Sequence, residues 1–322
     1  MSGWRAGLVA AVVGALVLGT GWLLERSSAP ATAPDSPAAP QDDGSATEGA
    51  VLACASSSAS ACEGAAATLG IPSTSWDAGD PLPDRGLTLA PVSDLVESGV
   101  DPDDITIVAS SPIVVGAWRD RSQILAASCG AIDLACVGSA LGASWSDLGG
   151  PEAWGRFKVA MADPTQSDPG LIAWSAVVDA VPRSQLEQLP ASLRVVGASE
   201  ADVISEVLAF GDSRADVVVG SEAIVLAQAV NAPGRGGRLE IFHLPQGPWV
   251  EFGAVTSGLL SGGLLDDILT PDVAAALTAA GLRPEVGLTG EVPPEMEGVG
   301  ERTPVPDDAA RATLIGLWEE LR

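Results

Sequence analysis

The chain has few basic residues. Lys and Arg together number 16 against 42 Asp and Glu, so the formal net charge is -26 at pH 7. A charge of this sign repels nucleic-acid phosphates and anionic lipid headgroups, and we therefore expect no nucleic-acid partner. Lysine occurs once, at Lys158, and tyrosine is absent, but neither shortage points to a function.

Histidine is equally rare, with His243 the only one. A zinc site needs closely spaced Cys ligands or several His, and the chain has neither pattern. The single imidazole lies in the apolar run of residues 241–244, and no GxSxG nucleophile elbow is present, which argues against a hydrolase. The acidic stretch DPDD at residues 101–104 lacks the spacing and the glycine of a calcium loop. We expect no metal site, no cofactor and no enzymatic activity.

The four cysteines fall into two close pairs, CASSSASAC at Cys54 and Cys62, and CGAIDLAC at Cys129 and Cys136. Pairing within each stretch is the natural expectation, although four cysteines allow three connectivities. Disulfides form in oxidising compartments, so these residues favour an exported protein. Because the closed loops are short, each disulfide is expected to stabilise the fold by only ~2 to 3 kcal/mol. The bonds would therefore fix loops and not determine the fold.

The N-terminal segment predicts attachment of the chain to a membrane. Residues 6–24 are uncharged and mostly apolar, a run long enough to span a bilayer as a helix. A cleaved signal peptide is the alternative, but no small-residue cleavage site and no cysteine for lipidation follow, so we favour an anchor over residues 1–26. Residues 27–50, rich in Ala, Pro and Ser, predict a disordered linker. We expect a single-pass protein of the cell membrane whose globular part is extracellular.

The remaining residues predict an α/β domain. The hydrophobic content of 47% is ample for a core, and β-branched runs alternate with helical patterns, as is typical of a mainly parallel sheet. The strands are expected at residues 105–109, 113–118, 157–162, 193–196, 216–220, 239–244 and 250–255. The helices are expected at residues 171–180, 199–210, 221–229, 272–280 and 307–321. The last helix is expected to bury Leu314, Leu317 and Trp318, and the Pro- and Gly-rich residues 284–306 to run along the surface.

The segment FKVAMADPTQSDPG, residues 157–170, is the clearest candidate for a binding site. An apolar strand ends at Asp163 and Pro164, and a helix begins a few residues later. Free backbone N–H groups and the helix dipole favour polar or anionic groups at such a start. The residues that would form this cradle are Thr165, Gln166, Ser167 and Gly170. The alternative is an ordinary capped turn between a strand and a helix.

Four stretches follow one another in a familiar order. They are ITIVASSPIVVGAW at residues 105–118, WSDL with FKVAMADPTQSDPG at residues 145–170, DVVVGSEA at residues 216–223, and PQGPWVEFGAV with LTPDVAAALTAAGLRP at residues 245–284. In this order the chain resembles the bacterial extracellular solute-binding proteins of the type II periplasmic-binding fold. It is most similar to the branch, related to molybdate-binding proteins, that occurs beside von Willebrand factor A domains. The resemblance covers roughly residues 76–321.

This resemblance implies two lobes that close on a ligand. Lobe 1 would hold about residues 51–156 and 248–322, and lobe 2 about residues 157–247. Ligands in such sheets bind at the carboxyl ends of strands, here between two facing edges. The implied ligand is a small polar or oxyanionic solute, and the implied partner is a membrane transporter. The implied ligand-binding residues are Ser110, Ser111, Thr165, Gln166, Ser167, Gly170 and Ser221. A plain turn before Pro112 and a helix N-cap at Ser221 are the alternatives.

One departure from the family pattern concerns the start of lobe 1. The stretch between Val51 and Ile105 is short for a first strand, helix and second strand, so this unit is either abbreviated or lost. If residues 51–55 form the first strand, Ser56, Ser57 and Ser58 stand at the cleft. If they do not, a second function becomes possible, a degenerate binding-protein fold used for interactions or sensing with cell-envelope proteins. Most tryptophans fit core packing, and Trp118 and Trp249 are kept as candidate cleft walls.

Overall fold

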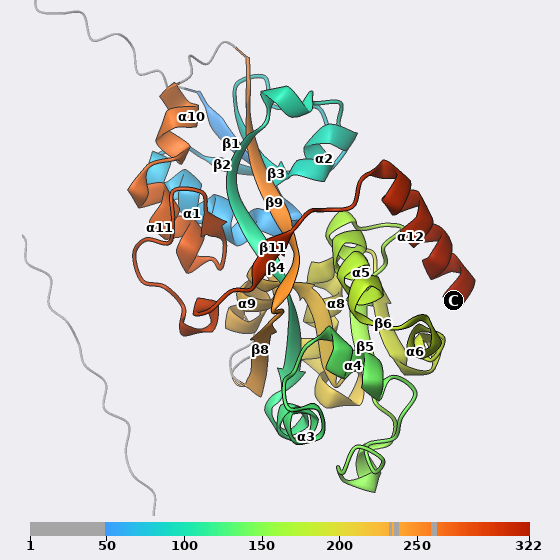
Figure 1. Ribbon diagram of the computed structural model, residues 1–322. Coiled ribbons are helices and arrows are strands. Elements are labelled where there is room, and N and C mark those ends of the chain that lie inside the picture. The colour runs from blue at the N-terminus through green and yellow to red at the C-terminus, as the bar shows by residue number, and fades with distance from the viewer. Residues whose placement is uncertain (1–48, 232–233, 235–237, 259–262) are drawn as a thin grey trace, which may run out of the picture. The chain divides into compact units, whose positions relative to one another are not determined.

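A computed structural model describes residues 49–231, 234, 238–258 and 263–322 (Figure 1). The predicted anchor and nearly all of the predicted linker lie outside these residues. Among the described residues no single helix has both the length and the apolar character needed to cross a membrane. One bent pair of helices, residues 119–129 and 134–140, is together long and apolar enough to cross a membrane, judged by length and composition alone.

Lobe 1 begins with a complete strand-helix-strand unit. The strands β1 (Val51–Ala55), β2 (Ser73–Trp76) and β3 (Gly86–Pro91) lie side by side, with β1 parallel to both neighbours. The helix α1 (Ala59–Leu69) connects β1 to β2, and α2 (Val92–Glu97) follows β3. The first unit is therefore short but present. A Cβ at Gly86 would overlap the carbonyl of Val51, which explains why glycine stands where β3 meets β1.

The strand β4 (Thr106–Trp118) runs from lobe 1 into lobe 2. Up to Pro112 it pairs with β9 (Gln246–Ser257), and from Ile113 it pairs with β7 (Val217–Ser221) and β8 (Leu239–His243). Pro112 has no N–H to donate and stands where the partner changes, a position that a strand proline tolerates. The turn predicted at residues 110–112 is therefore wrong, because the two strands predicted around it are one.

Lobe 2 is a second sheet covered by helices. Its remaining strands are β5 (Val159–Ala162) and β6 (Leu193–Gly197), which are parallel to each other, and β5 is also parallel to β7. Its helices are α3 (Arg119–Cys129), α4 (Leu134–Ala140), α5 (Asp168–Ala180), α6 (Arg183–Leu186), α7 (Leu189–Ser192), α8 (Glu200–Phe210) and α9 (Glu222–Asn231). The main strand order through both lobes is β2-β1-β3-β9-β4-β7-β5-β6. Since β4 is antiparallel to both of its neighbours β9 and β7, and β9 is antiparallel to β3, the predicted mainly parallel sheet is wrong and the sheet is mixed.

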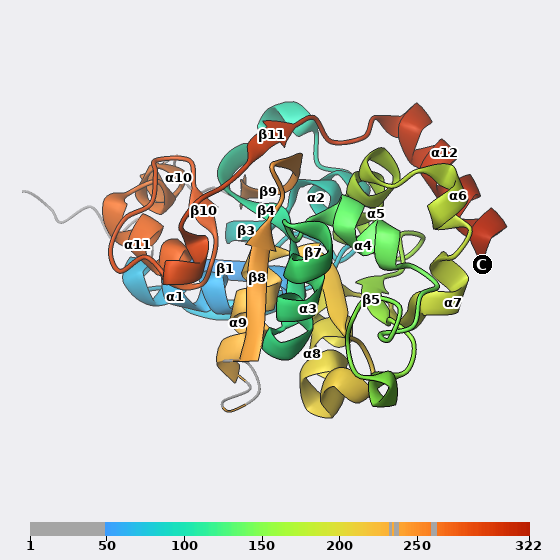
Figure 2. The ribbon, with the colours of Figure 1, turned by 60° about the horizontal axis from the view of Figure 1, so that its bottom comes forward.

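The C-terminal residues return to lobe 1 and then cross to lobe 2. The elements are α10 (Gly263–Ile268), α11 (Pro271–Ala279), β10 (Arg283–Pro284), β11 (Glu301–Thr303) and α12 (Asp308–Leu321). β10 pairs with β4 and β11 with the start of β9, whereas α12 packs on α5 (Figures 1 and 2). The indoles of Trp174 and Trp318 meet edge to face at 5.2 Å, and Trp174 Nε1 donates to the Leu314 carbonyl at 2.9 Å. The predicted closing helix is confirmed, although Leu317 is only partly buried.

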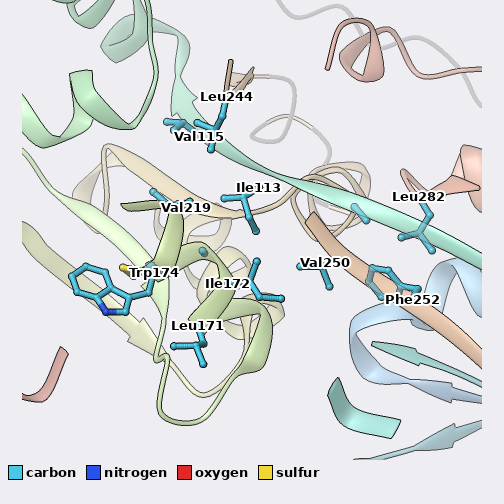
Figure 3. Close-up of a cluster of buried hydrophobic side chains, with 14 of the residues drawn as sticks. Ile113, Val115, Leu171, Ile172, Trp174, Val219, Leu244, Val250, Phe252 and Leu282 are labelled. Atoms are coloured by element: carbon cyan, nitrogen blue, oxygen red, sulfur yellow. The ribbon is translucent and has the colours of Figure 1, made fainter. Parts of the chain in front are cut away.

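We define the lobes by strand pairing, with the change at Pro112 and Ile113 in β4 and at residues 244–249 before and within β9. This definition gives residues 113–156, counted with lobe 1 in the sequence analysis, to lobe 2. One apolar cluster continues across the junction, from Trp174 and Ile172 of α5 to Val250 and Phe252 of β9 (Figure 3). The lobes therefore share a packed core at this junction, which we call the hinge.

Both disulfides are sequential, which confirms the expected pairing. Cys54 and Cys62 join β1 to α1 with a Cα–Cα distance of 5.7 Å, and Cys129 and Cys136 join the end of α3 to α4 at 5.6 Å. The first bond spans the 3₁₀ turn Ser56–Ser58, which lies directly after β1.

Replacing Cys54 and Cys62 together with serine is expected to lower the free energy of unfolding by ~2 to 3 kcal/mol, the chain-entropy value for so short a loop. Urea unfolding under oxidising conditions measures the loss. The matched control is the same double change at Cys129 and Cys136. In addition, only the first pair is expected to increase amide exchange in residues 56–58; equal exchange in both variants would contradict a role in fixing this turn.

Candidate functional site

The two lobes enclose a small polar cavity, which we call the Ser57 cavity. Its volume is about 210 Å³. Lobe 1 contributes Ser56, Ser57, Trp76, Asp77, Asp94 and Glu97, among others, and lobe 2 contributes Gln166, Ser167, Asp168, Ser199 and Glu200. These residues come from the ends of β1, β2 and β6, from α2, and from the starts of α5 and α8. The cavity therefore lies where the carboxyl ends of strands from both lobes face each other, the usual ligand position in open α/β sheets.

A second cavity of about 380 Å³ lies beside it, and we call it the tail cavity because residues of the C-terminal segment line it. Val305, Asp308 and Arg311 form its outer wall, opposite residues of α2 and β9. Glu97 and Asp168 line both cavities, so they stand between the two spaces. Asp168 pairs with Arg311 on the tail side.

The turn after β1 brings two serines to the Ser57 cavity. Ser58 is buried, and its hydroxyl donates to the carbonyls of Ala55 and Leu89 at 3.2 and 3.1 Å, so its role is to fix the turn. Ser56 and Ser57 line the cavity. The Ser57 hydroxyl is buried and has no hydrogen-bond partner in the part of the chain that the structure describes. A buried hydroxyl without a partner is costly, and a hydrogen bond to a bound solute would offset that cost.

Glu200, the first residue of α8, is the most buried acid of the cavity. Its carboxylate accepts hydrogen bonds from the backbone N–H and the hydroxyl of Ser221, at 2.9 and 2.5 Å. Burial raises the pKa of Glu200 to about 7 despite these two bonds. Ser221, predicted to contact a ligand, is itself buried and supports Glu200 instead.

Asp94 of α2 is a second acid of the lining, contributed by lobe 1. Burial, and then the neighbouring charge of Asp168, raise the pKa of Asp94 to about 6. Its one hydrogen bond to a side chain is a long contact, 3.4 Å, from the Ser93 hydroxyl. Carboxylates that are desolvated without a compensating cation take up protons more readily, so both acids titrate near neutral pH.

The predicted cradle after β5 is largely satisfied from within. Asp163 accepts from the Thr165 N–H at 3.0 Å and from the Thr165 hydroxyl at 2.7 Å, and Arg322 pairs with it at 2.7 Å. Burial alone would raise the pKa of Asp163, but the Thr165 bonds and Arg322 lower it. Ser167 caps α5 by accepting from the Gly170 N–H at 3.1 Å. Of these residues, Gln166 and Ser167 still line the Ser57 cavity, whereas Thr165 does not.

Three other predicted ligand-binding residues lie in the core. Ser110 and Ser111 are buried within β4, and the Ser111 hydroxyl accepts from the N–H of Ala223 at 2.9 Å, which caps α9. Gly170 is buried, and a Cβ there would come within 2.9 Å of the Ala162 Cβ, so it allows α5 to approach β5. Their structural roles account for these residue types without a ligand.

The two tryptophans expected at the cleft lie elsewhere. Trp118 is buried in lobe 2, and its Nε1 donates to the Ala215 carbonyl at 2.8 Å. Trp249 lies near the guanidinium groups of Arg283 and Arg302, at 5.8 and 5.7 Å from the ring centroid. The tryptophan that lines the Ser57 cavity is Trp76, which the sequence analysis missed. It follows the short polar run STS, which carries no strand signal of its own.

A buried ionic cluster lies at the hinge. Glu222 at the start of α9 accepts from Arg283 Nε at 2.8 Å and from His243 Nε2 at 2.5 Å. Arg283 also donates to the Met296 carbonyl at 2.9 Å. Glu222 and Arg283 come from different lobes and have side-chain exposures of 0 and 9%. The lone histidine is thus part of a structural cluster, and no nucleophile that it would activate adjoins it among these contacts.

Neither the known protein families nor the curated proteins include a match to this chain. Solved structures do match. The periplasmic binding protein AfuA of Actinobacillus pleuropneumoniae, with fructose-6-phosphate bound, is 14% identical, with a TM-score of 0.56 over 84% of this chain and 97% of that one. The ferric binding protein of Campylobacter jejuni is 11% identical, with a TM-score of 0.57 over 84% and 99%. A periplasmic thiamin binding protein is 12% identical, with a TM-score of 0.51 over 84% and 95%.

Identities this low establish the fold alone. The chain has the fold of the type II periplasmic solute-binding proteins, as the order of its sequence segments predicted.

Proposed function

We propose that this protein is a solute-binding protein that captures a small polar molecule in the Ser57 cavity and acts outside the cell. The observation that carries the proposal is the cavity itself, which both lobes line at the ends of strands. Its volume of about 210 Å³ is below the ~300 to 1,000 Å³ of pockets for drug-sized ligands, which favours a small solute. Non-enzymatic binding is the activity that these groups support.

The complete first unit of lobe 1 supports this function over the alternative of an interaction or sensing module. That alternative depends on loss of the first strand and its loop. β1 is present, its disulfide holds the following turn, and the Ser57 hydroxyl has no hydrogen-bond partner among the described residues. The lobes therefore both contribute polar groups, as a solute receptor requires.

Three further parts of the proposal come from the sequence. The apolar residues 6–24 favour tethering to the cell membrane, and the two disulfides favour an oxidising exterior. Delivery to a membrane transporter is the role that we propose for the bound solute. Membership of the molybdate-related branch stays a prediction.

The experiment is a thermal unfolding screen of the full chain against sugars, amino acids, amines, oxyanions and metal ions. A ligand at 100 times its Kd adds ~2.7 kcal/mol to stability, which raises the midpoint by several degrees. Replacing Ser57 and Gln166 together with alanine is expected to abolish this increase, because each lines the cavity from a different lobe. Thr165→Ala, outside the cavity, is the matched control and is expected to keep it. Loss in the control with retention in the double variant would place the solute at the cradle instead.

A further inference from the structure

The lining of the Ser57 cavity has one sign of charge. Five carboxylates contribute to it, Asp77, Asp94, Glu97, Asp168 and Glu200, and none of the described residues that line it is Lys, Arg or His. Asp168 is paired with Arg311 on the tail side. The other four have no ion-pair partner among the residues that the structure describes. Of these four, Asp77 and Glu97 are exposed, whereas Asp94 is partly buried and Glu200 is buried. Without a cation, the carboxylates of Asp94 and Glu200 carry a desolvation cost, which a bound positive charge would offset.

The helix starts at this cavity disfavour an anion. A helix N-terminus attracts negative charge, and α5 and α8 begin here. Each already carries a carboxylate in its first turn, Asp168 and Glu200 respectively. The positions that an oxyanion would occupy next to the helix dipoles are therefore taken by the protein's own acids. Of the two ligand classes expected from sequence, the oxyanionic one conflicts with this arrangement.

The carboxylates also do not form a metal site. No group of three His, Cys, Asp or Glu close enough to hold a metal ion occurs in the described part of the chain. The acids are instead spread around the cavity, from β2 and α2 on one side to α5 and α8 on the other. Such a distribution suits a cation of several atoms that places N–H groups against separate acceptors.

Neutral groups in the lining complete the match. The unpartnered Ser57 hydroxyl can accept a hydrogen bond, as can the Gln166 carboxamide oxygen. The Trp76 indole adds an aromatic surface, which attracts ammonium groups through its negative face. Taking ~30 Å³ of liquid volume per water, about 210 Å³ is the space of about seven waters, enough for a short aliphatic amine.

We propose that the Ser57 cavity binds a small organic cation, an aliphatic amine in its ammonium form. This inference rests on the proposed function and names the ligand class of the same site. Asp94 and Glu200, one from each lobe, would face the bound positive charge. The net charge of -26 would also draw cations toward the protein at low ionic strength.

The test uses the full chain and titration calorimetry at low ionic strength with solutes of similar length and different charge. Putrescine is the dication, 1,4-butanediol the neutral analogue and succinate the dianion, with choline as a second cation. We expect a cation to bind at least tenfold more tightly than butanediol, and succinate not to bind. Asp94→Asn is expected to weaken cation binding about tenfold, while Glu319→Gln, an exposed acid of α12 with the same change in charge, leaves it unchanged. Glu200→Gln is the second site variant.

Each other outcome has a defined meaning. If succinate, butanediol or another uncharged or anionic solute of the thermal screen binds in preference to the cations, the cationic inference is overturned and the proposed function stands. If a cation binds equally well to Asp94→Asn and Glu200→Gln, the Ser57 cavity is not its site. If no solute of any charge binds, the proposed function fails with the inference.

Discussion

Replacing Arg283 with methionine is expected to lower the free energy of unfolding by ~3 to 5 kcal/mol, the usual cost of removing one partner of a buried ion pair, with Glu222 keeping only its contact to His243. Glu222 is fully buried, and Arg283 holds both of its oxygens, at 2.8 and 3.0 Å. The change also leaves the Met296 carbonyl without the Arg283 donor. Urea unfolding at pH 7 measures the loss.

Arg302→Met is the matched control for this prediction. Arg302 also pairs with one glutamate, Glu251, and lies near the same Trp249 ring, but both side chains are about a third exposed, at 39 and 32%. Exposed pairs contribute ~0 to 1 kcal/mol, so the control is expected to lose little. Replacing Glu222 with glutamine in the Arg283→Met background should recover much of the loss. Equal losses at Arg283 and Arg302 would contradict the importance of burial here.

The stability of the fold is expected to fall as the pH rises from 4.5 to 8, with Glu200 a principal cause. Burial raises the pKa of Glu200 from an ordinary 4.5 to about 7, so the folded state holds this proton more tightly than the unfolded chain. The associated stability is fully present below pH 4.5 and is lost as the pH passes 7. At ~1.4 kcal/mol per pH unit, the loss is on the order of 3 kcal/mol. Asp94, with its pKa raised to about 6, acts in the same direction.

Glu200→Gln isolates this contribution. The glutamine oxygen still accepts from the Ser221 N–H, and its amide can donate to the Ser221 hydroxyl, as the protonated acid would. We expect the variant to match the natural protein at pH 4.5 and to be more stable by on the order of 3 kcal/mol at pH 8, in paired urea unfolding curves. Glu206→Gln, on the exposed side of α8, is not expected to reproduce the gain. No gain at pH 8 in Glu200→Gln would show that Glu200 ionises in the fold without penalty.

Local sequence patterns predicted four helices, three in lobe 2 and one in lobe 1, better than they predicted the strands of lobe 1. The helices from residues 168, 200, 222 and 271 begin with strong start signals, such as Ser167 and Pro271, and were predicted to within a few residues. The prediction divided β4 into two strands because Ser110, Ser111 and Pro112 have the sequence of a turn. Only pairing with β9 on one stretch and β7 on the next holds these residues extended, and no local window contains that information. β2 and β3, with STSW and GLTLAP, were missed because they are short and contain Gly, Pro or polar residues.

The candidate site was predicted only in part, for a related reason. Gln166 and Ser167 were found because a strand end and a helix start are local features. Asp94 and Glu200 have the pattern of ordinary first-turn acids, and only the packing of one lobe against the other buries them. The serines after β1 were expected at the cleft only if residues 51–55 formed the first strand, and the structure contains this strand. Charge in the lining therefore depends on tertiary structure that residue spacing does not reveal.

The C-terminal segment forms a short tether between the lobes. β11 is fixed to β9, α12 is fixed to α5, and residues 304–307 are all that connects them, with prolines at two of these positions. The five Cα–Cα steps from residue 303 to residue 308 span about 17 Å when fully extended, which is the greatest length of the tether. Any separation of the lobes that admits a solute must stay within this length or detach α12. The amplitude of opening is thus limited mechanically by the length of a short proline-rich connector, which begins beside β9 and ends on α5.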